Sequence, residues 1–128
     1  TIASEGVNVV PINMASAQLG DLARGLVDCA AIVIGTPTVL GGPHPSIQHV
    51  AYLASKLRPP AKFLGVVESH GWSGGAVKYL ADLLGGLQGE IVGAIDVPGK
   101  PTEEDVKKIV DFGKDLAGKV KKYLNNSR

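Results

Sequence analysis

The sequence predicts an α/β fold in which helices cover both faces of a parallel sheet, a three-layer αβα sandwich. Short apolar runs alternate with segments whose apolar residues recur every three or four positions, as strands alternate with amphipathic helices. Seventeen glycines and only six aromatic residues indicate tight connections between the elements. The 128 residues match the usual length of one domain, and we expect residues 1–128 to form one.

The predicted elements follow one another as a helix end and then four strand-helix pairs. The strands are expected at Val7–Ile12, Ala30–Gly35, Lys62–Glu68 and Glu90–Val97. The helices are expected at Gln18–Val27, Ser46–Leu57 and Gly75–Leu84, with a long last helix after Thr102 and a helix end at Thr1–Glu5. This alternation favours parallel strands joined by right-handed crossovers.

The elements of the first half of the chain are predicted from the pattern of apolar residues and from the positions of glycines. Thr1–Glu5 should end a helix because Gly6 is a typical C-terminal stop. Val7–Ile12 is short, apolar and β-branched, which is typical of a strand. Gln18–Val27 has an apolar helical stripe in spite of its two glycines. Ala30–Gly35 is continuously apolar, as expected for a strand that is covered on both faces.

The later elements have clear ends. Ser46–Leu57 should stop at Arg58-Pro59-Pro60, because proline cannot continue a helix. Gly75–Leu84 should end at Gly85-Gly86. Thr102 precedes Asp105 by three residues, a capping-box arrangement that should start the last helix, and residues 125–128 should fray. The predicted buried face of that helix is Val106, Ile109, Val110, Gly113, Leu116, Ala117, Val120 and Leu124.

The composition excludes several classes of protein. Apolar residues make up 45% and charged residues 20% of the chain, which is ordinary for a globular domain. The net charge of +1 gives no field that would attract nucleic acid or an anionic membrane. No apolar stretch reaches the ~18 residues of a membrane span and no secretory signal is visible, so we expect a cytoplasmic protein. Cys29 is the single cysteine, so no internal disulfide can form.

Two glycine-rich segments follow the second and third predicted strands. They are Gly35–Pro45 (GTPTVLGGPHP) and Ser69–Ala76 (SHGWSGGA). Loops that follow parallel strands lie at the carboxyl edge of a sheet, where ligands bind, so we expect the two segments to form one site. Their backbone amides and the N-termini of the following helices favour an electron-rich or anionic group, and Trp72 offers a flat surface for stacking. A planar heterocycle with polar edges would suit these groups.

Each of these features also has an ordinary structural explanation. Glycine, proline and threonine are common in any strand-to-helix turn. Trp72 could pack rather than stack, His44 and His70 could be solvated loop residues, and His49 could be structural or exposed. The sequence has no zinc-type cluster, nucleophile elbow, Walker loop or dinucleotide fingerprint, so we predict no complete catalytic site in this chain alone.

The two segments resemble the flavin-binding loops of the flavodoxin-like domains of flavodiiron proteins (A-type flavoproteins). GTPTVLGGPHP is similar to the family's Ser/Thr-Pro-Thr motif, which an Asn/Gly-rich stretch and a proline follow. HGWSGGAV is similar to Tyr-Gly-Trp-Ser-Gly-Glu-Ala, with His70 at the tyrosine position and Gly75 at the glutamate position. The order and spacing of the elements match from about residue 6 to residue 124.

The resemblance implies that the domain binds FMN and transfers electrons, with the flavin ring between the two loops and Trp72 against the ring. The flavin would do the redox chemistry, so the resemblance implies no catalytic residue and no metal ligand in this chain. The residues carried over by motif position are Thr36, Pro37, Thr38, Val39, Leu40 and Gly41 from the first loop, and Ser69, His70, Gly71, Trp72 and Ser73 from the second.

The resemblance also implies a flavodoxin-like domain that is truncated at its N-terminus. The family pattern opens with a strand, a phosphate-binding loop and a helix, and Thr1 aligns near the end of that helix. The di-iron domain that reduces oxygen or nitric oxide in the family is likewise not in this sequence. We therefore expect a redox partner protein or a di-iron domain as partner. The alternative is a flavin-free remnant that serves in interaction or assembly.

Truncation would also affect the sheet. In the flavodoxin strand order 2-1-3-4-5, the first strand lies between those predicted at Val7–Ile12 and Ala30–Gly35, so two apolar edges would be unpaired. Val7–Ile12 could move beside Ala30–Gly35, a second copy could pair with the edges, or a separate polypeptide could donate a strand. We expect self-association.

Overall fold

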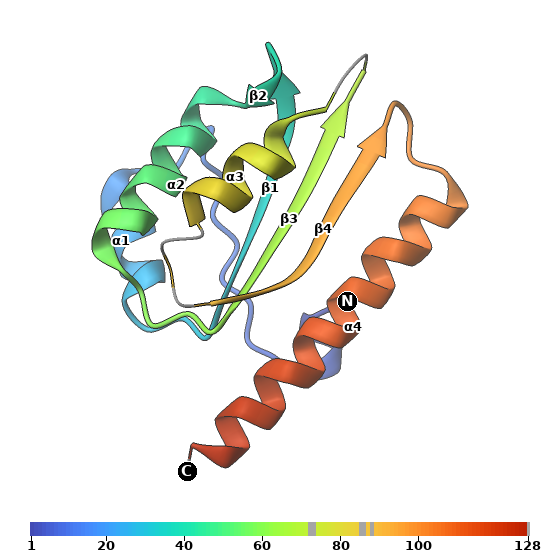
Figure 1. Ribbon diagram of the computed structural model, residues 1–128. Coiled ribbons are helices and arrows are strands. Elements are labelled where there is room, and N and C mark those ends of the chain that lie inside the picture. Colours follow the sequence, from blue (N-terminus) through green and yellow to red (C-terminus); the bar gives the residue numbers. More distant parts are fainter. Residues whose placement is uncertain (72–73, 85–86, 88, 128) are drawn as a thin grey trace.

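The computed structural model describes residues 1–71, 74–84, 87 and 89–127, and Figure 1 shows their arrangement. Helices α1, α2 and α3 cover one face of a sheet and α4 covers the other, so the predicted α/β sandwich is confirmed. The strands are β1 (Ala31–Val39), β2 (Gly42–Pro43), β3 (Phe63–His70) and β4 (Glu90–Pro98). The helices are α1 (Leu19–Val27), α2 (Pro45–Leu57), α3 (Ala76–Leu84) and α4 (Glu103–Asn126), with a 3-10 turn η1 at Ala3–Glu5.

The sheet has the order β2-β1-β3-β4 among the described residues. β3 lies between β1 and β4 and runs parallel to both, with Thr36 opposite Glu68 and Glu68 opposite Asp96. The short strand β2 is antiparallel to the end of β1. The carboxyl ends of β1, β3 and β4 therefore meet at one edge of the sheet (Figure 1).

The segment 7–12 is not a strand, so the prediction for Val7–Ile12 is wrong. It runs as coil between η1 and α1 and pairs with no described strand (Figure 1). An apolar, β-branched run becomes a strand only where a neighbouring backbone completes its hydrogen bonds, and Pro11 also lacks an N–H. Ile12 instead packs on α1 at Gly25. A Cβ added to Gly25 would lie only 2.8 Å from Ile12 Cδ1, which shows how close the two residues are. The segment has therefore not moved beside β1.

The strands run further than the sequence indicated. β1 continues through Thr36–Val39 and β3 continues through Ser69 and His70, all of which were predicted to be loop. The hairpin between β1 and β2 supplies backbone partners for Thr38 and Val39, and this pairing extends β1. Gly6 ends η1 with a φ of 87°, as predicted.

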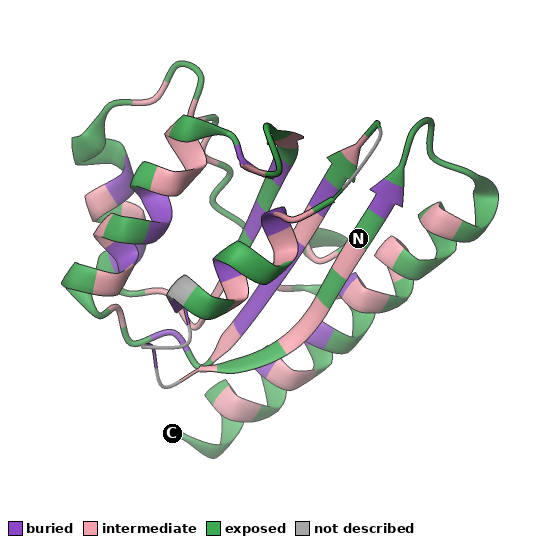
Figure 2. Cartoon of the chain, turned by 45° about the horizontal axis from the view of Figure 1, so that its top comes forward, coloured by how far each residue is buried: buried purple, intermediate pink, exposed green. Residues whose placement is uncertain are grey.

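The main core lies between the sheet and α1, α2 and α3. Figure 2 shows buried residues along β1 and β3 and on the helix faces turned toward them. The buried residues that form this cluster are Leu22, Leu26, Ile34, Val50, Ala51, Ala54, Ala61, Leu64, Val66, Leu80, Leu84 and Leu87.

On the opposite face, α4 is seated by the ring of Phe112. Gly65 and Gly93 are register partners on β3 and β4, and a Cβ on either would lie 2.3 or 2.4 Å from a Phe112 ring carbon. The two glycines thus leave a flat surface on which the ring packs. Because side chains cannot overlap at such distances, this contact determines how closely α4 approaches the sheet.

The ends of α4 depart in part from the prediction. Thr102 and Asp105 form the predicted capping box, and Gly113, Leu116, Ala117 and Val120 are buried as predicted. Val106 is 51% exposed and Leu124 is 44% exposed, because both lie toward the helix ends while the sheet contacts the middle. The helix also continues through Asn125 and Asn126, which were predicted to fray.

We predict that Gly93→Ala lowers the free energy of unfolding by about 1–3 kcal/mol, because the added methyl group would force the Phe112 ring to move. Gly118→Ala is the matched control. A Cβ at Gly118, on the exposed side of α4, would contact nothing within 4 Å, so alanine should stabilise the helix by up to about 1 kcal/mol. Urea unfolding measures both changes, and equal effects at the two positions would contradict the packing role of Phe112.

Candidate functional site

The first predicted loop consists of the end of β1 and a two-residue turn. Thr36 is buried, its hydroxyl donates to the Pro37 carbonyl, and its oxygen accepts from the amide of His44 at 3.0 Å. Thr36 therefore holds the chain where it enters α2. Thr38 lies on the same face of β1, whereas Pro37 and Val39 are exposed on the other face.

Leu40 and Gly41 form the tip of the β1–β2 hairpin. Val39 pairs with Gly42, so two residues make the turn, and both have positive φ, 52° for Leu40 and 78° for Gly41. Two-residue hairpin turns with positive φ at both positions favour Asn-Gly, and a leucine there is strained. The Leu40 side chain is fully exposed. A strained, exposed apolar residue thus stands at the tip of the first loop.

The two predicted loops are in direct contact. A Cβ on Gly75 would lie 2.3 Å from the Gly41 carbonyl oxygen, so the start of α3 lies against the hairpin turn. This contact involves backbone atoms on both sides, and only glycine fits at position 75 without moving one of them. Gly41 and Gly75 therefore bring the described parts of the two segments into contact.

Glu68, which the sequence analysis treated only as the end of a strand, joins these parts together. Its side chain is 3% exposed, on the face of β3 that is turned toward α3. The Thr38 hydroxyl donates to its carboxylate at 2.7 Å, and the Ala76 amide donates at 2.7 Å. The Gly75 amide donates at 3.3 and 3.4 Å to the two carboxylate oxygens. The sequence did contain a signal for the role of Glu68, namely a charged residue directly after the apolar run at residues 63–67.

These contacts stabilise the ionised form of Glu68. Burial raises the pKa of the carboxyl group, but the hydrogen bonds from Thr38 and from the first amides of α3 outweigh burial and lower the pKa below its ordinary value of 4.5. A carboxylate at a helix N-terminus is also favoured by the helix dipole. The stabilisation is complete above the ordinary pKa and is lost as the pH falls through the lowered one.

The helix N-termini at this edge are satisfied from within the chain, which differs from the expectation that they favour an external anion. In α2, the first residue is Pro45, which has no N–H, and the Ser46 amide donates to His44 Nδ1 at 3.1 Å. In α3, the first amides donate to Glu68. The first amides of α2 and α3 at this edge are therefore occupied by groups of the chain itself.

His70 forms the third part of the site and is not a solvated loop residue. Its side chain is 12% exposed at the end of β3, and its Nε2 lies 2.8 Å from Asp96 Oδ1 on β4. His70 Nδ1 is buried and has no hydrogen-bond partner among the described residues. Sequence reasoning missed Asp96, because pairing between β3 and β4 brings it beside His70. His44 and His49, in contrast, are exposed.

The remaining predicted residues are accessible or not described. Ser69 and Gly71 are exposed beside His70. Trp72 and Ser73 lie outside the described residues. No group of three metal-ligating side chains occurs among the residues that the structure describes, and none of their helices is long and apolar enough to cross a membrane.

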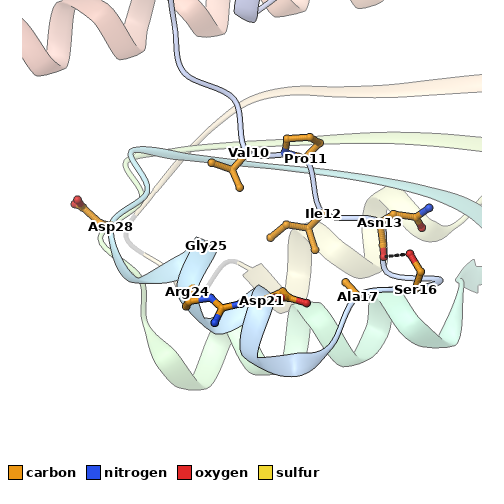
Figure 3. A pocket seen from close by; sticks show the side chains of 10 residues that line it. All are labelled: Val10, Pro11, Ile12, Asn13, Ser16, Ala17, Asp21, Arg24, Gly25 and Asp28. Atoms are coloured by element: carbon orange, nitrogen blue, oxygen red, sulfur yellow. Dashed lines mark hydrogen bonds and ion pairs between the residues drawn. The ribbon is translucent and has the colours of Figure 1, made fainter.

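A pocket of about 510 Å³ lies elsewhere, between the segment 10–17 and α1 (Figure 3). Val10, Pro11 and Ile12 form one side, and Asp21 and Arg24 form an ion pair on the other. None of the predicted site residues lines it. This pocket and the candidate site are therefore separate.

We predict that Leu40→Asn raises the free energy of unfolding by about 1 kcal/mol, because asparagine tolerates positive φ better than leucine. Leu124→Asn is the control, since Leu124 is an exposed leucine with ordinary helical backbone. It should give no such gain. Urea unfolding of both variants checks the prediction, and a loss of stability in Leu40→Asn would show that the turn is not strained.

No family model matches the chain. The coenzyme F420H2 oxidase of Methanocaldococcus jannaschii is 30% identical over 92% of this chain. The rubredoxin-oxygen oxidoreductase of Megalodesulfovibrio gigas is 30% identical over 76% of it. The matched regions cover only 29% and 24% of these two relatives, so the chain spans less than a third of their length.

Solved structures agree with this relationship. The rubredoxin oxygen:oxidoreductase of Desulfovibrio gigas superposes with a TM-score of 0.89 and 26% identity, over 95% of this chain and 31% of that chain. The flavodiiron core of Flv1 from Synechocystis gives 0.85 and 27%, over 95% and 30%. An archaeal flavodoxin gives 0.73 and 26%, over 94% and 82%. The chain is therefore a flavodoxin-like module similar to the flavin domains of the flavodiiron proteins, and its relatives include oxidoreductases.

Proposed function

We propose that the domain binds FMN at the carboxyl edge of β1 and β3 and transfers electrons. The observation that carries this proposal is the contact between the Gly41 carbonyl and Gly75, which makes the two motif-bearing loops one continuous surface. The similarity to flavodiiron proteins and to an archaeal flavodoxin supports a flavin as the ligand.

The chemistry of the described residues fits the flavin ring. The exposed parts of the site include apolar Pro37 and Leu40 and polar Ser69, with the half-exposed carboxylate of Asp96 beside His70. His70 lies beside these residues at the end of β3, with its side chain 12% exposed. Since the first amides of α2 and α3 are occupied by His44 and Glu68, the described residues fit the ring rather than the phosphate group of FMN.

FMN would supply the electron-accepting ring, and the residues of this chain would bind and orient it. The domain would exchange electrons with a redox partner protein or a di-iron domain, in the cytoplasm. This role requires no acid, base or nucleophile from the chain. Binding and orientation are therefore the properties to test.

We predict that the purified chain quenches the fluorescence of added FMN and gives it a perturbed absorbance band. Riboflavin should bind comparably, because the described residues fit the ring. Trp72→Ala should weaken binding about tenfold, the effect expected from the loss of one stacking contact. Tyr52→Ala is the control, since Tyr52 is a half-exposed aromatic residue on α2. A chain that leaves the spectrum of added FMN unchanged would contradict the proposal.

A second role, in assembly, is favoured by the outer edge of β1. Among the described residues, only Thr38 and Val39 have a strand partner on that edge, through β2. Val33 on β1 is 42% exposed. An apolar strand edge with unpaired backbone groups favours pairing with another strand. We propose that a second copy of the chain pairs there.

We predict that the chain sediments as a concentration-dependent dimer at micromolar concentration. Val33→Lys should shift the equilibrium toward monomer, because a charge on an edge strand opposes strand pairing. Val106→Lys, at an exposed valine of α4, is the matched control and should leave the equilibrium unchanged. A wild-type chain that remains monomeric at these concentrations would rule out self-association. A dimer that ignores FMN would favour the assembly role over the flavin role.

A further inference from the structure

We propose that Glu68 is the positioning residue of the flavin site. Its carboxylate links the end of β1 to the start of α3, so that both segments are in place before the ligand binds. This inference rests on the proposed binding of FMN. It concerns a residue outside both glycine-rich motifs.

The first step is the geometry of the link. Glu68 extends from β3, which lies between β1 and β4 in the sheet. One of its oxygens accepts hydrogen bonds from both Thr38 on β1 and the Ala76 amide of α3, each at 2.7 Å. The Gly75 amide approaches both oxygens. The carboxylate thus joins the start of α3 to Thr38 on β1, which lies 30 residues before Glu68 in the sequence.

The second step is the requirement for a carboxylate at this position. Thr38 and the amides of Gly75 and Ala76 all donate to the Glu68 oxygens, and the two amides can only donate. Its negative charge faces the positive end of the α3 dipole, and no described cation pairs with it. Glutamine has nearly the same size and one oxygen for Thr38 and Ala76, but its amide nitrogen would then face the Gly75 amide, a second donor. It also lacks the negative charge, so glutamine should hold the start of α3 less strongly than the carboxylate.

The third step is the consequence for binding. Leu40–Gly41 and the residues that start α3 belong to connections, and ordering such connections at the moment of binding weakens affinity. Glu68 orders them in the ligand-free chain. Gly74 and Gly75 are part of this arrangement, because a Cβ at Gly74 would lie 2.6 Å from Glu68 Oε1 and one at Gly75 would strike the Gly41 carbonyl. The flavin then meets a preformed surface.

The experiment compares wild type, Glu68→Gln and Thr38→Val by amide hydrogen exchange without ligand and by FMN titration. First-turn amides of a helix have no partner within the helix and exchange quickly unless they are capped. We expect Gly75 and Ala76 to be protected in wild type and to exchange about tenfold faster in Glu68→Gln, because one charged hydrogen-bond acceptor is lost. Thr38→Val should leave these two amides protected, because it removes only the link to β1.

For FMN, we expect Glu68→Gln to weaken affinity about tenfold, the loss that corresponds to one charge-assisted hydrogen bond. Thr38→Val should also weaken affinity. The double variant should bind no more weakly than Glu68→Gln alone, because the two groups act through one link.

Two control variants distinguish a positioning role of Glu68 from a general effect of lower stability or of a changed net charge. Gly93→Ala destabilises the fold at a distant contact and should leave FMN affinity of the folded chain unchanged. Glu104→Gln removes one charge from a side chain of α4 that is 78% exposed and should change neither measurement.

Each outcome decides between the two proposals. Glu68→Gln with faster exchange at Gly75 and Ala76 but wild-type FMN affinity would overturn the positioning role and leave the proposed function standing. Slow exchange in Glu68→Gln would overturn the link itself. A wild-type chain that binds no FMN would overturn both proposals.

Discussion

The ionised Glu68 side chain is the interaction on which the carboxyl edge of this domain depends. It satisfies the first amides of α3 and the hydroxyl of Thr38 at once, and these donors hold its pKa below the ordinary value in spite of burial. A buried carboxylate is tolerated only where donors surround it, so the position of the hairpin and the start of α3 are coupled. One side chain therefore links the end of β1 to the start of α3.

The rest of the fold brings the partners of Glu68 within reach. Parallel pairing of β1, β3 and β4 aligns Thr36, Glu68 and Asp96 in adjacent strands. The residues that follow these three in the chain therefore lie together at the carboxyl edge of the sheet. On the far face, Phe112 packs over Gly65 and Gly93 and seats α4 against β3 and β4. Side-chain packing on both faces and backbone pairing within the sheet thus support the same edge.

Much of this organisation could be predicted, and the exceptions have physical causes. The α/β order, the capping box at Thr102 and the stop at Gly6 are local in sequence and were predicted correctly. Val7–Ile12 was predicted as a strand from composition, yet it has no backbone partner among the described residues. The second part of β1 was taken for loop because its pairing with β2 depends on the turn at Leu40 and Gly41. The roles of Glu68 and Asp96 were missed because their partners come from other strands.

The sequence by itself determined the alternation of strands and helices and the two glycine-rich segments that point to a flavin, because periodicity, capping residues and motifs are properties of neighbouring residues. Only the tertiary structure decided that these segments touch at Gly41 and Gly75, and that the first amides of α2 and α3 are already occupied. It also decided that Val7–Ile12 stays a coil while Thr36–Val39 is a strand. Each of these outcomes depends on which hydrogen-bond partner or packing neighbour the folded chain brings into contact, and the pattern of apolar residues and motifs does not specify that contact.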